Sequence, residues 1–230
     1  MAMKLLITSG GTTEAIDAVR GITNHSTGQL GKIIAETFLA KGFDVTLVTT
    51  KTSVKPAKQP HLTIHEVINV DQLMTILKEE VPKHDLLIHS MAVSDYSPVY
   101  MTDFDTVAAA DHLQTFLTAS NKEAKISSAA DYQVLFLKKT PKVISYIKEW
   151  NPNIRLVGFK LLVNAPAEEL ISVARDSLHK NKADYIVAND LADIKANQHK
   201  AFLVNDKTVC SANTKEELAQ LIYERIIAHD

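Results

Sequence analysis

Short β-rich runs alternate with amphipathic helical segments along most of this 230-residue chain. Lys4–Thr8, Phe43–Thr49 and Asp85–His89 are apolar enough to be buried strands. Residues 28–41 and 166–180 carry apolar side chains at helical spacing. Strand–helix–strand alternation implies right-handed crossovers, and therefore a parallel sheet covered by helices on both faces. We predict an α/β fold with a doubly wound, mostly parallel sheet in three layers, of the Rossmann-like type.

The remaining elements follow from weaker signals of the same kind. Further strands are expected at Leu62–Val67, Tyr132–Leu137, Ile154–Leu161, Asp184–Ala188 and Ala201–Asn205, and further helices are expected after Asp71, after Thr140-Pro141 and after the capping box Thr214–Glu217. Residues 97–128 lack clear periodicity, and we interpret them as a flap or dimer arm. The expected organisation is one domain over residues 1–230 with an excursion at about 97–128.

Composition excludes several classes of protein. Lys and Arg number 25 against 27 Asp and Glu, so no excess of positive charge indicates a nucleic acid or an anionic membrane as partner. The single cysteine, Cys210, allows no internal disulfide and is typical of a reducing compartment. The chain has no secretory leader pattern and no apolar stretch of membrane-spanning length. We therefore expect a cytoplasmic protein.

Five of the seven glycines lie in the first 31 residues, around the first predicted strand–helix junction. Nineteen residues, Ser9 to Thr27, separate that strand from its helix, although about two to six would be usual. Glycines let the backbone approach a ligand, and Ser26 or Thr27 can cap a helix whose first N–H groups attract anions. We predict a phosphate site that includes Gly10, Gly11, Gly28 and Gly31. The alternative is that these glycines serve only tight turns and close packing.

The known phosphate-binding motifs do not fit this junction. GxxxxGK[ST] and GxGxxG are both absent, and no acidic residue follows the second strand to hold the ribose of NAD. Lys51 at that position leaves an NADP-binding Rossmann-type reductase as an alternative, although no YxxxK occurs. The chain also lacks GxSxG, HExxH and CxxC, and the histidines His61 and His65 have no evident third ligand.

Three other segments stand at predicted strand ends, where ligands bind in such folds. They are Ser90–Tyr96, Gly158–Lys160 and Asn189-Asp190. Taken singly, Asp95 and Asp190 are typical turn or cap residues. Together with the glycines, the segments outline one cleft.

At this point the motifs resemble a known family. The segments ITSGGTTEAIDAVRGITNHSTGQLG, AVSDY, LVGFK and ADYIVAND, in this order, are similar to phosphopantothenate–cysteine ligase. The resemblance spans nearly the whole chain and implies a free-standing bacterial form, without the flavin-dependent decarboxylase to which the ligase is often fused. It also implies a homodimer that joins 4′-phosphopantothenate to L-cysteine through an acyl-nucleotidylate, with a nucleoside triphosphate and Mg²⁺.

The resemblance assigns roles to individual residues. Asn24 matches the asparagine that contacts the acyl intermediate, and Arg20 matches an arginine that binds phosphopantothenate across a dimer interface. Ala92 belongs to the substrate site. The nucleotide and its phosphates would contact Gly10, Gly11, Ser26, Thr27, Gly28, Gly31, Ser90, Met91, Asp95, Pro141, Val143, Ile144, Phe159 and Asn189.

This chain departs from the family pattern at places that affect two lysine assignments and the choice of nucleotide. Lys125 matches the flap lysine of the activation step, with Lys122 as a rival. Ser177 and Asn181 occupy the positions of two further family lysines, and Lys180, one place away, is the candidate nucleotide ligand there. GFKLL resembles the ATP-using eukaryotic form, whereas the N-terminal block looks bacterial and favours CTP. The metal ligands are left open, and a non-catalytic sensor of phosphate ligands is a further alternative.

Overall fold

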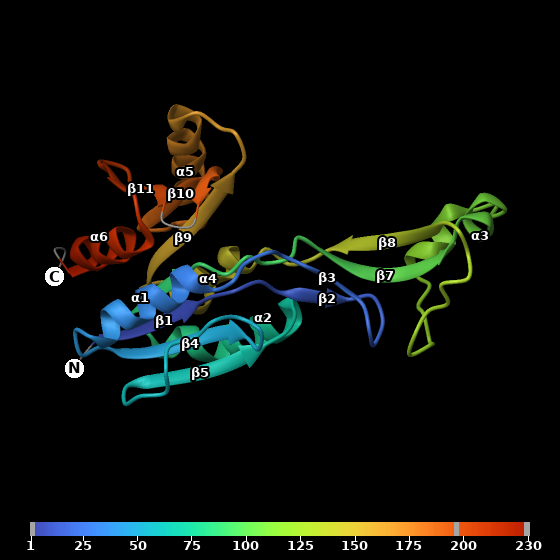
Figure 1. Ribbon diagram of the computed structural model, residues 1–230, viewed down its shortest axis with the longest axis horizontal. Helices are drawn as coiled ribbons and strands as arrows, with labels where there is room; N and C mark the ends of the chain where they lie inside the picture. The colour runs from blue at the N-terminus through green and yellow to red at the C-terminus, as the bar shows by residue number, and fades with distance from the viewer. Residues whose placement is uncertain (1–2, 196–197, 228–230) are drawn as a thin grey trace.

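An eight-stranded sheet forms the centre of the computed structural model, which describes residues 3–195 and 198–227 (Figure 1). The spatial order of its strands is β12-β11-β10-β9-β6-β1-β4-β5. These strands are β1 (Lys4–Thr8), β4 (Asp44–Thr50), β5 (Leu62–Val67), β6 (Leu86–His89), β9 (Arg155–Leu162), β10 (Tyr185–Lys195), β11 (Gln198–Val204) and β12 (Val209–Ala212).

The order of the parallel strands reverses between β1 and β6. From β1 the chain builds outward through β4 and β5, then returns to the other side of β1 and continues through β6, β9 and β10. All neighbours among these six strands pair in parallel, whereas β11 and β12 are antiparallel additions. The predicted doubly wound, mostly parallel sheet is confirmed, and its switch point lies between β1 and β6.

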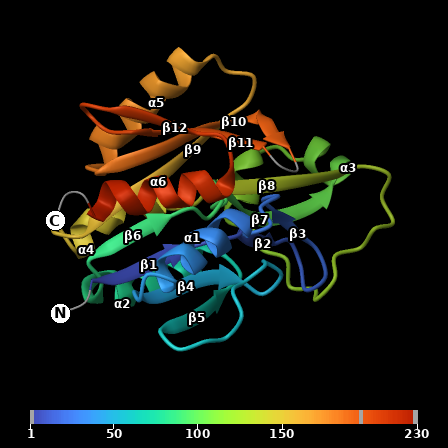
Figure 2. The ribbon, with the colours of Figure 1, turned by 60° about the vertical axis from the view of Figure 1, so that its left-hand side comes forward.

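Helices cover both faces of the sheet and complete the three layers (Figure 2). One face carries α1 (Gln29–Leu39) and α6 (Lys215–Ile227), which bury Ile34, Phe38 and Ile222 against β1 and β4. The other carries α2 (Val70–Glu80), α4 (Ile147–Trp150) and α5 (Ala167–Asn181), with the 3₁₀ turns η1 (Val81–Lys83) and η3 (Val143–Tyr146). None of the helices in the described ranges has the length and apolar character needed to cross a bilayer.

Three predicted helix starts needed correction. The N-cap position of α1 is Gly28 in a left-handed conformation with φ 79°, and the helix is shorter than residues 28–41. Thr27 still serves the helix start, because its Oγ1 accepts from Gln29 N at 3.3 Å. Asn69, not Asp71, caps α2 by accepting a hydrogen bond from Gln72 N at 3.0 Å. The segment after Thr140-Pro141 begins as a 3₁₀ turn rather than an α-helix. The predicted cap of α6 is present, because Thr214 Oγ1 accepts from Glu217 N at 3.1 Å.

Two excursions leave the body at the carboxyl end of the sheet (Figure 1). The arm consists of the antiparallel strands β7 (Tyr96–Asp103) and β8 (Gln133–Lys139), with α3 (Phe104–Ala108) and the 3₁₀ turn η2 (Leu113–Leu117) between them. The stacked rings of Tyr100, Phe116 and Phe136 give it a small core of its own. The expected excursion therefore extends beyond residues 97–128, and the strand predicted at Tyr132–Leu137 belongs to the arm rather than to the main sheet.

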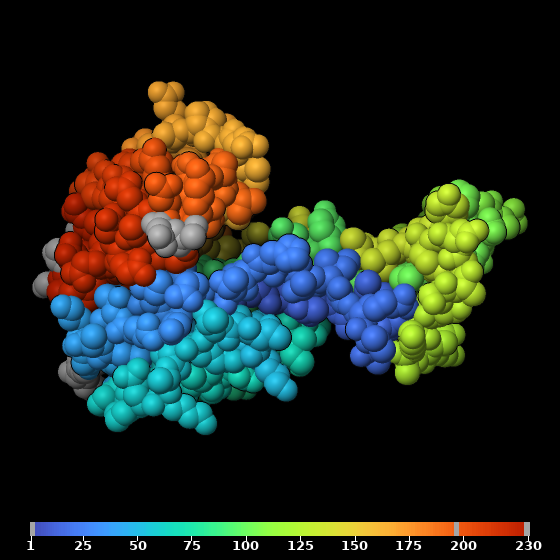
Figure 3. All heavy atoms as spheres, in the orientation of Figure 1, coloured from blue at the N-terminus to red at the C-terminus, as the bar shows by residue number. Residues whose placement is uncertain are grey.

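The second excursion is a hairpin formed within the long loop after β1. Its strands β2 (Thr13–Ala15) and β3 (Gly21–Thr23) pair antiparallel, and β2 lies against β7 of the arm. In space-filling view the hairpin and the arm project together from the rounded body (Figure 3). The doubly wound sheet therefore carries a projecting unit at the edge where ligands of such sheets bind.

Candidate functional site

The loops that follow β1 and β6 meet at the switch point of the sheet. Ala92 N donates to Gly10 O at 2.8 Å and Thr12 N donates to Ala92 O at 3.0 Å, so the two loops pair like a short parallel bridge. Side chains reinforce this pairing, because Thr12 Oγ1 and Ser94 Oγ lie 2.9 Å apart and Ser90 Oγ donates to Thr8 O at 2.7 Å. The structure therefore brings the first glycine segment and the Ser90–Asp95 segment to one place.

Asn24 lies at this junction, at the base of the hairpin. Its side-chain Nδ2 donates to Ala92 O at 3.2 Å and lies 3.4 Å from Ser94 Oγ, while its backbone N donates to Thr12 O. These contacts hold a half-buried amide in one orientation between the two loops. An amide NH₂ in this position can donate to a negatively charged oxygen that develops on a bound ligand.

The glycines at the junction have a packing role that is independent of any phosphate. A Cβ on Gly10, whose φ is +85°, would meet the side chain of Ser53. A Cβ on Gly31 would lie 2.5 Å from Ser9 Cβ, so α1 approaches the end of β1 as closely as a glycine permits. Gly11 is equally close to the backbone of Asn24. The packing interpretation of the sequence thus accounts for these glycines, and phosphate binding by them stays a prediction.

A buried histidine lies beneath the junction, at the end of β6. His89, the last residue of β6, lies with Nδ1 2.7 Å from Thr8 Oγ1. Burial, with the nearby Lys142 as a smaller cause, lowers the pKa of His89 to about 4. The ring is therefore neutral at physiological pH. Next to it, the Met91 side chain belongs to the hydrophobic core, so only the backbone of Met91 is available to a ligand.

Further predicted residues gather at the carboxyl ends of β6, β9 and β10. Asp95 accepts a hydrogen bond from Lys142 Nζ at 3.1 Å, and Thr140 N donates to Asp95 O, which joins the Pro141–Ile144 segment to the loop after β6. Val143 and Ile144 are buried there, and Ile144 lies against Gly158 of β9. Phe159 pairs with Val187, two residues before the buried Asn189.

Asp190 stabilises a turn, as the sequence predicts when this residue is considered singly. Its Oδ2 accepts from Ala165 N at 2.6 Å and its Oδ1 accepts from Ala192 N at 2.7 Å. These backbone N–H groups hold the pKa of Asp190 below its usual range. The carboxylate therefore fixes the loop between β9 and α5, and both of its oxygens are already used.

Arg20 and Lys125 lie together, but away from Asn24 in the same chain. Arg20 is at the tip of the hairpin, four residues from Asn24, which is roughly 13 Å at ~3.3 Å per strand residue. Lys125 is exposed in the loop that leads from η2 back to β8 and contacts this tip, where Ala18 N donates to Ala124 O at 3.0 Å. The two cationic candidates thus form one group on the projecting unit.

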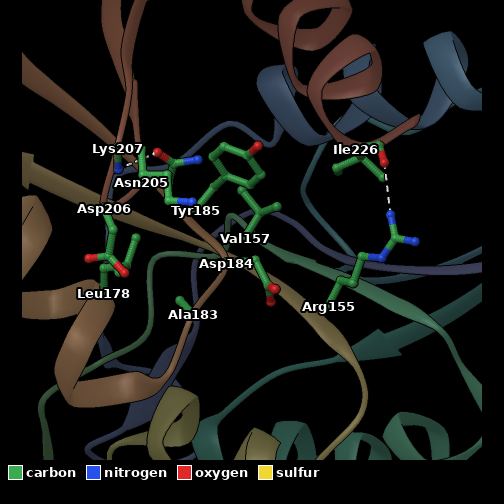
Figure 4. Close-up of a pocket in the computed structure, with 10 residues that line it drawn as sticks. All are labelled: Arg155, Val157, Leu178, Ala183, Asp184, Tyr185, Asn205, Asp206, Lys207 and Ile226. Atoms are coloured by element: carbon green, nitrogen blue, oxygen red, sulfur yellow. Dashed lines mark hydrogen bonds between the residues drawn. The ribbon is translucent and has the colours of Figure 1, made fainter. Parts of the chain in front are cut away.

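Lys180 lies away from the junction in the same chain. It lies in the last turn of α5, which ends at the amino edge of the sheet, opposite to Asn24. The neighbouring residues Leu178 and Ala183 line a cavity of about 420 Å³ together with Arg155 at the start of β9 (Figure 4). Within one chain Lys180 thus lies at the opposite edge of the sheet from the junction, because a helix that follows β9 runs back to the start of β10 before the chain re-enters the sheet. Its role as a nucleotide ligand stays a prediction.

Several residues that support the site had no signal in the sequence analysis. The buried hydroxyl residues Thr12 and Ser94 connect the loops after β1 and β6, and the buried Ser53 pairs with Thr50 at the end of β4. Glu14 caps α2 from the hairpin, since its Oε1 accepts from Val70 N at 2.9 Å. Burial raises the pKa of Glu14, against the opposing effect of that N–H group. In the sequence these residues are ordinary polar residues in or beside predicted loops, and nothing in it indicates that they are buried.

Comparisons with known proteins agree with this geometry. A crystal structure of the DNA/pantothenate metabolism flavoprotein from Streptococcus pneumoniae is 55% identical and covers 100% of both chains, with a TM-score of 0.96. The C-terminal domain of a coenzyme A biosynthesis bifunctional protein CoaBC is 25% identical, with a TM-score of 0.73, over 99% of this chain and 97% of that domain.

Among curated proteins, the coenzyme A biosynthesis bifunctional protein CoaBC of Thermococcus kodakarensis is 33% identical over 227 residues, which is 97% of this chain and 50% of that protein. The chain thus spans about half the length of the curated relatives it matches. The sequence model described as the DNA/pantothenate metabolism flavoprotein C-terminal domain matches residues 1–229. Because this match covers nearly the whole chain, the chain belongs to the family of DNA/pantothenate metabolism flavoprotein C-terminal domains.

Proposed function

We propose that this chain is a ligase that joins 4′-phosphopantothenate to L-cysteine and so forms 4′-phosphopantothenoylcysteine in coenzyme A biosynthesis. The observation that carries the proposal is the Asn24 amide, held at the switch point by Ala92 O at 3.2 Å. The names of the relatives, which refer to coenzyme A biosynthesis, support the pathway. The unit proposed to act is the whole segment 1–230, including the arm.

In the first step a carboxylate oxygen of phosphopantothenate attacks the α-phosphorus of a nucleoside triphosphate. The bond between the α-phosphorus and its bridging oxygen to the β-phosphate breaks, and pyrophosphate leaves with the electron pair. Lys125 would stabilise the negative charge that accumulates on the phosphates. Ser26, Thr27, Ser90 and the first turn of α1 would orient the nucleotide, with Phe159 and Asn189 closing the cleft.

In the second step the amine of cysteine attacks the acyl carbon of the acyl-nucleotidylate. The acyl carbon–oxygen bond breaks, the nucleoside monophosphate leaves, and the amine loses a proton. The Asn24 amide would donate to the acyl oxygen as negative charge develops on it, a contribution typically worth about 10²–10³ in rate. Arg20 would pair with the phosphate of phosphopantothenate through Nη1, because Nε and Nη2 already donate to Asp17 and to Ile126 O.

We propose CTP as the nucleotide, with ATP as the alternative, and Mg²⁺ as its counter-ion. Within residues 3–195 and 198–227 no three His, Cys, Asp or Glu side chains gather to hold a metal. Hydroxyl groups and one amide predominate at the junction, so these residues fit an ion that is ligated mainly by phosphates and water. When bound, Mg²⁺ would neutralise charge on the triphosphate.

We further propose that the protein is a homodimer in which the projecting unit serves the partner's site. Arg20 lies roughly 13 Å along the strand from Asn24 of its own chain at ~3.3 Å per residue. Lys125 lies next to Ile126, whose backbone contacts Arg20 and Asp17 at the hairpin tip. Apolar side chains at the outer end of the arm are exposed, including Leu117 and Tyr132. The unpaired Cys210 and the small polar substrates fit a cytoplasmic location.

The test is pyrophosphate release by the purified protein with CTP or ATP, with and without phosphopantothenate. We expect release only when both the nucleotide and phosphopantothenate are present, faster with CTP, and formation of the amide product only after cysteine is added. Faster release with ATP would keep the ligase and reverse the choice of nucleotide. Absence of release with both nucleotides, together with tight NADPH binding, would refute the ligase in favour of a reductase.

A further inference from the structure

One carboxylate organises the contact between the hairpin tip and the arm. Asp17 accepts five hydrogen bonds through its two oxygens. Oδ1 accepts from Val19 N at 2.9 Å and from Arg20 N at 2.8 Å. Oδ2 accepts from Arg20 Nη2 at 2.6 Å, from Arg20 Nε at 3.0 Å and from Ile126 N at 3.1 Å. Asp17 thus connects its own turn, the Arg20 guanidinium and the arm loop.

The arm loop is held on both sides of Lys125. Arg20 Nη2 also donates to Ile126 O at 2.9 Å, and Ala18 N donates to Ala124 O at 3.0 Å. The Ile126 side chain is buried, whereas Lys125 is exposed. These contacts at Ala124 and Ile126 hold the backbone on both sides of Lys125 while its side chain stays exposed. Lys122 lies outside these contacts.

The Asp17 side chain is shielded from solvent to an unusual degree for a hairpin tip. Only 1% of its surface is exposed, against 34% for the Arg20 side chain. The hydrogen bonds from Arg20, followed by those from backbone N–H groups, hold the pKa of Asp17 well below its usual range. A charged carboxylate that is enclosed by five donors can occupy only a narrow range of positions, and its donors are equally restricted.

We propose that Asp17 is a positioning residue that locks the Arg20 guanidinium and the Lys125 backbone into one arrangement, so that both cations are presented to the substrates together. This rests on the proposed ligase function for its consequences in catalysis. The lock itself is a physical property of the hairpin and the arm loop. It has no need of a direct contact between Asp17 and the substrates.

The lock is tested first without any substrate, by hydrogen exchange measured with mass spectrometry on the full chain. In Asp17→Asn, backbone amides of residues 121–128 should exchange about tenfold faster than in the wild type, because the loop opens more often. Asp111→Asn removes an exposed arm carboxylate and is the matched control, for which exchange should be unchanged. Asp17→Ser provides a second variant if Asp17→Asn folds poorly by thermal unfolding.

Kinetics then test the coupling. Arg20→Ala should mainly raise the KM for phosphopantothenate, and Lys125→Ala should mainly lower kcat for pyrophosphate release. Asp17→Asn should change both, and combining it with either variant should cost far less than the product of the separate effects, because the residues act as a unit. Asp17→Glu, which restores the charge, should recover part of the loss.

The two proposals fail in different ways. Unchanged exchange in residues 121–128 of Asp17→Asn and Asp17→Ser would overturn the lock, whatever the activity. Multiplicative kinetic effects would also overturn it, since Asp17 would then act independently of Arg20 and Lys125. A wild-type chain that releases no pyrophosphate would refute the ligase, and the exchange measurement would still decide whether Asp17 holds the loop.

Discussion

At the scale of single residues, the polar groups of this chain divide into those that support the fold and those that remain available to a ligand. Asp190 and Asp17 use their oxygens for backbone N–H groups, and Glu14 caps a helix. Asn24, in contrast, is oriented at the switch point by Ala92 O at 3.2 Å and by Ser94 Oγ at 3.4 Å. The residue type alone did not distinguish these cases, because each of them is a polar residue in a loop or a short strand.

A buried histidine gives a prediction on acid stability. His199 on β11 is buried, and within the described ranges neither of its ring nitrogens has a hydrogen-bond partner. Burial, with Lys215 as a smaller cause, lowers the pKa of His199 to about 4. The unfolded chain therefore binds the proton more readily, and stability falls as the pH drops from ~6.5 towards ~4.

Replacing this side chain by an apolar one should remove that loss. In His199→Leu, the free energy of unfolding at pH 7 should be equal or higher, because no unsatisfied polar group remains. Between pH 7 and 4.5 the wild type should lose roughly 2 kcal/mol more than the variant. Urea unfolding across this range measures the difference, with the exposed His112→Gln as control. If the free energies of unfolding of wild type and His199→Leu fall equally between pH 7 and 4.5, His199 is not the cause of the acid sensitivity.

At the scale of elements, the start of α1 packs directly against the end of β1. Ser9 Oγ donates to Gly28 O at 3.1 Å, and Gly31 leaves no space for a Cβ beside Ser9. The helix therefore begins directly over the end of the strand. The same approach serves packing and brings the first turn of α1 to the proposed nucleotide.

A methyl group at this junction should affect activity and stability together. Gly31→Ala forces Ser9 to move, which should cost roughly 1–3 kcal/mol and reduce nucleotide-dependent pyrophosphate release per folded molecule. Gly42→Ala is the control: its φ of +81° should cost about 1–2 kcal/mol, but open space surrounds it and activity should persist. Normal release by Gly31→Ala would show that the junction does not contact the nucleotide.

At the scale of the whole molecule, the projecting unit exposes several large apolar side chains to solvent. Phe104, Leu113, Leu117 and Tyr132 are each more than half exposed at the outer end of the arm. Monomeric proteins rarely leave contiguous apolar surface uncovered, and such patches mark interaction sites. This agrees with the proposed homodimer, in which the arm would reach a second copy.

Sedimentation measures this directly. The wild-type chain should sediment as a dimer, and Leu117→Asp should shift the equilibrium towards monomer, because a charge would have to be buried in the interface. Val209→Asp on the edge strand β12, away from the arm, should leave the dimer intact. A wild-type monomer at micromolar concentration, or an unchanged dimer in Leu117→Asp, would contradict the role of the arm.

The sequence by itself determined the layered sheet and the faces of its helices, because burial imposes periods of 2 and 3.6 that are visible in the residues. The helices predicted at residues 28–41 and 166–180 bury apolar side chains such as Phe38 and Leu170. Local contacts with weaker signals, such as the caps of α1 and α2, were misassigned because several neighbouring residues could serve equally well.

Tertiary structure alone decided which distant segments meet. Asn24 contacts Ala92 because the strand order reverses between β1 and β6. Lys180 lies away from both because α5 ends at the other edge of the sheet. Asp17 and Ile126 are 109 positions apart in the chain, yet one hydrogen bond joins them. Periodicity indicates which side of an element is buried, but not which other element covers it. The candidate site is formed by such contacts between distant segments.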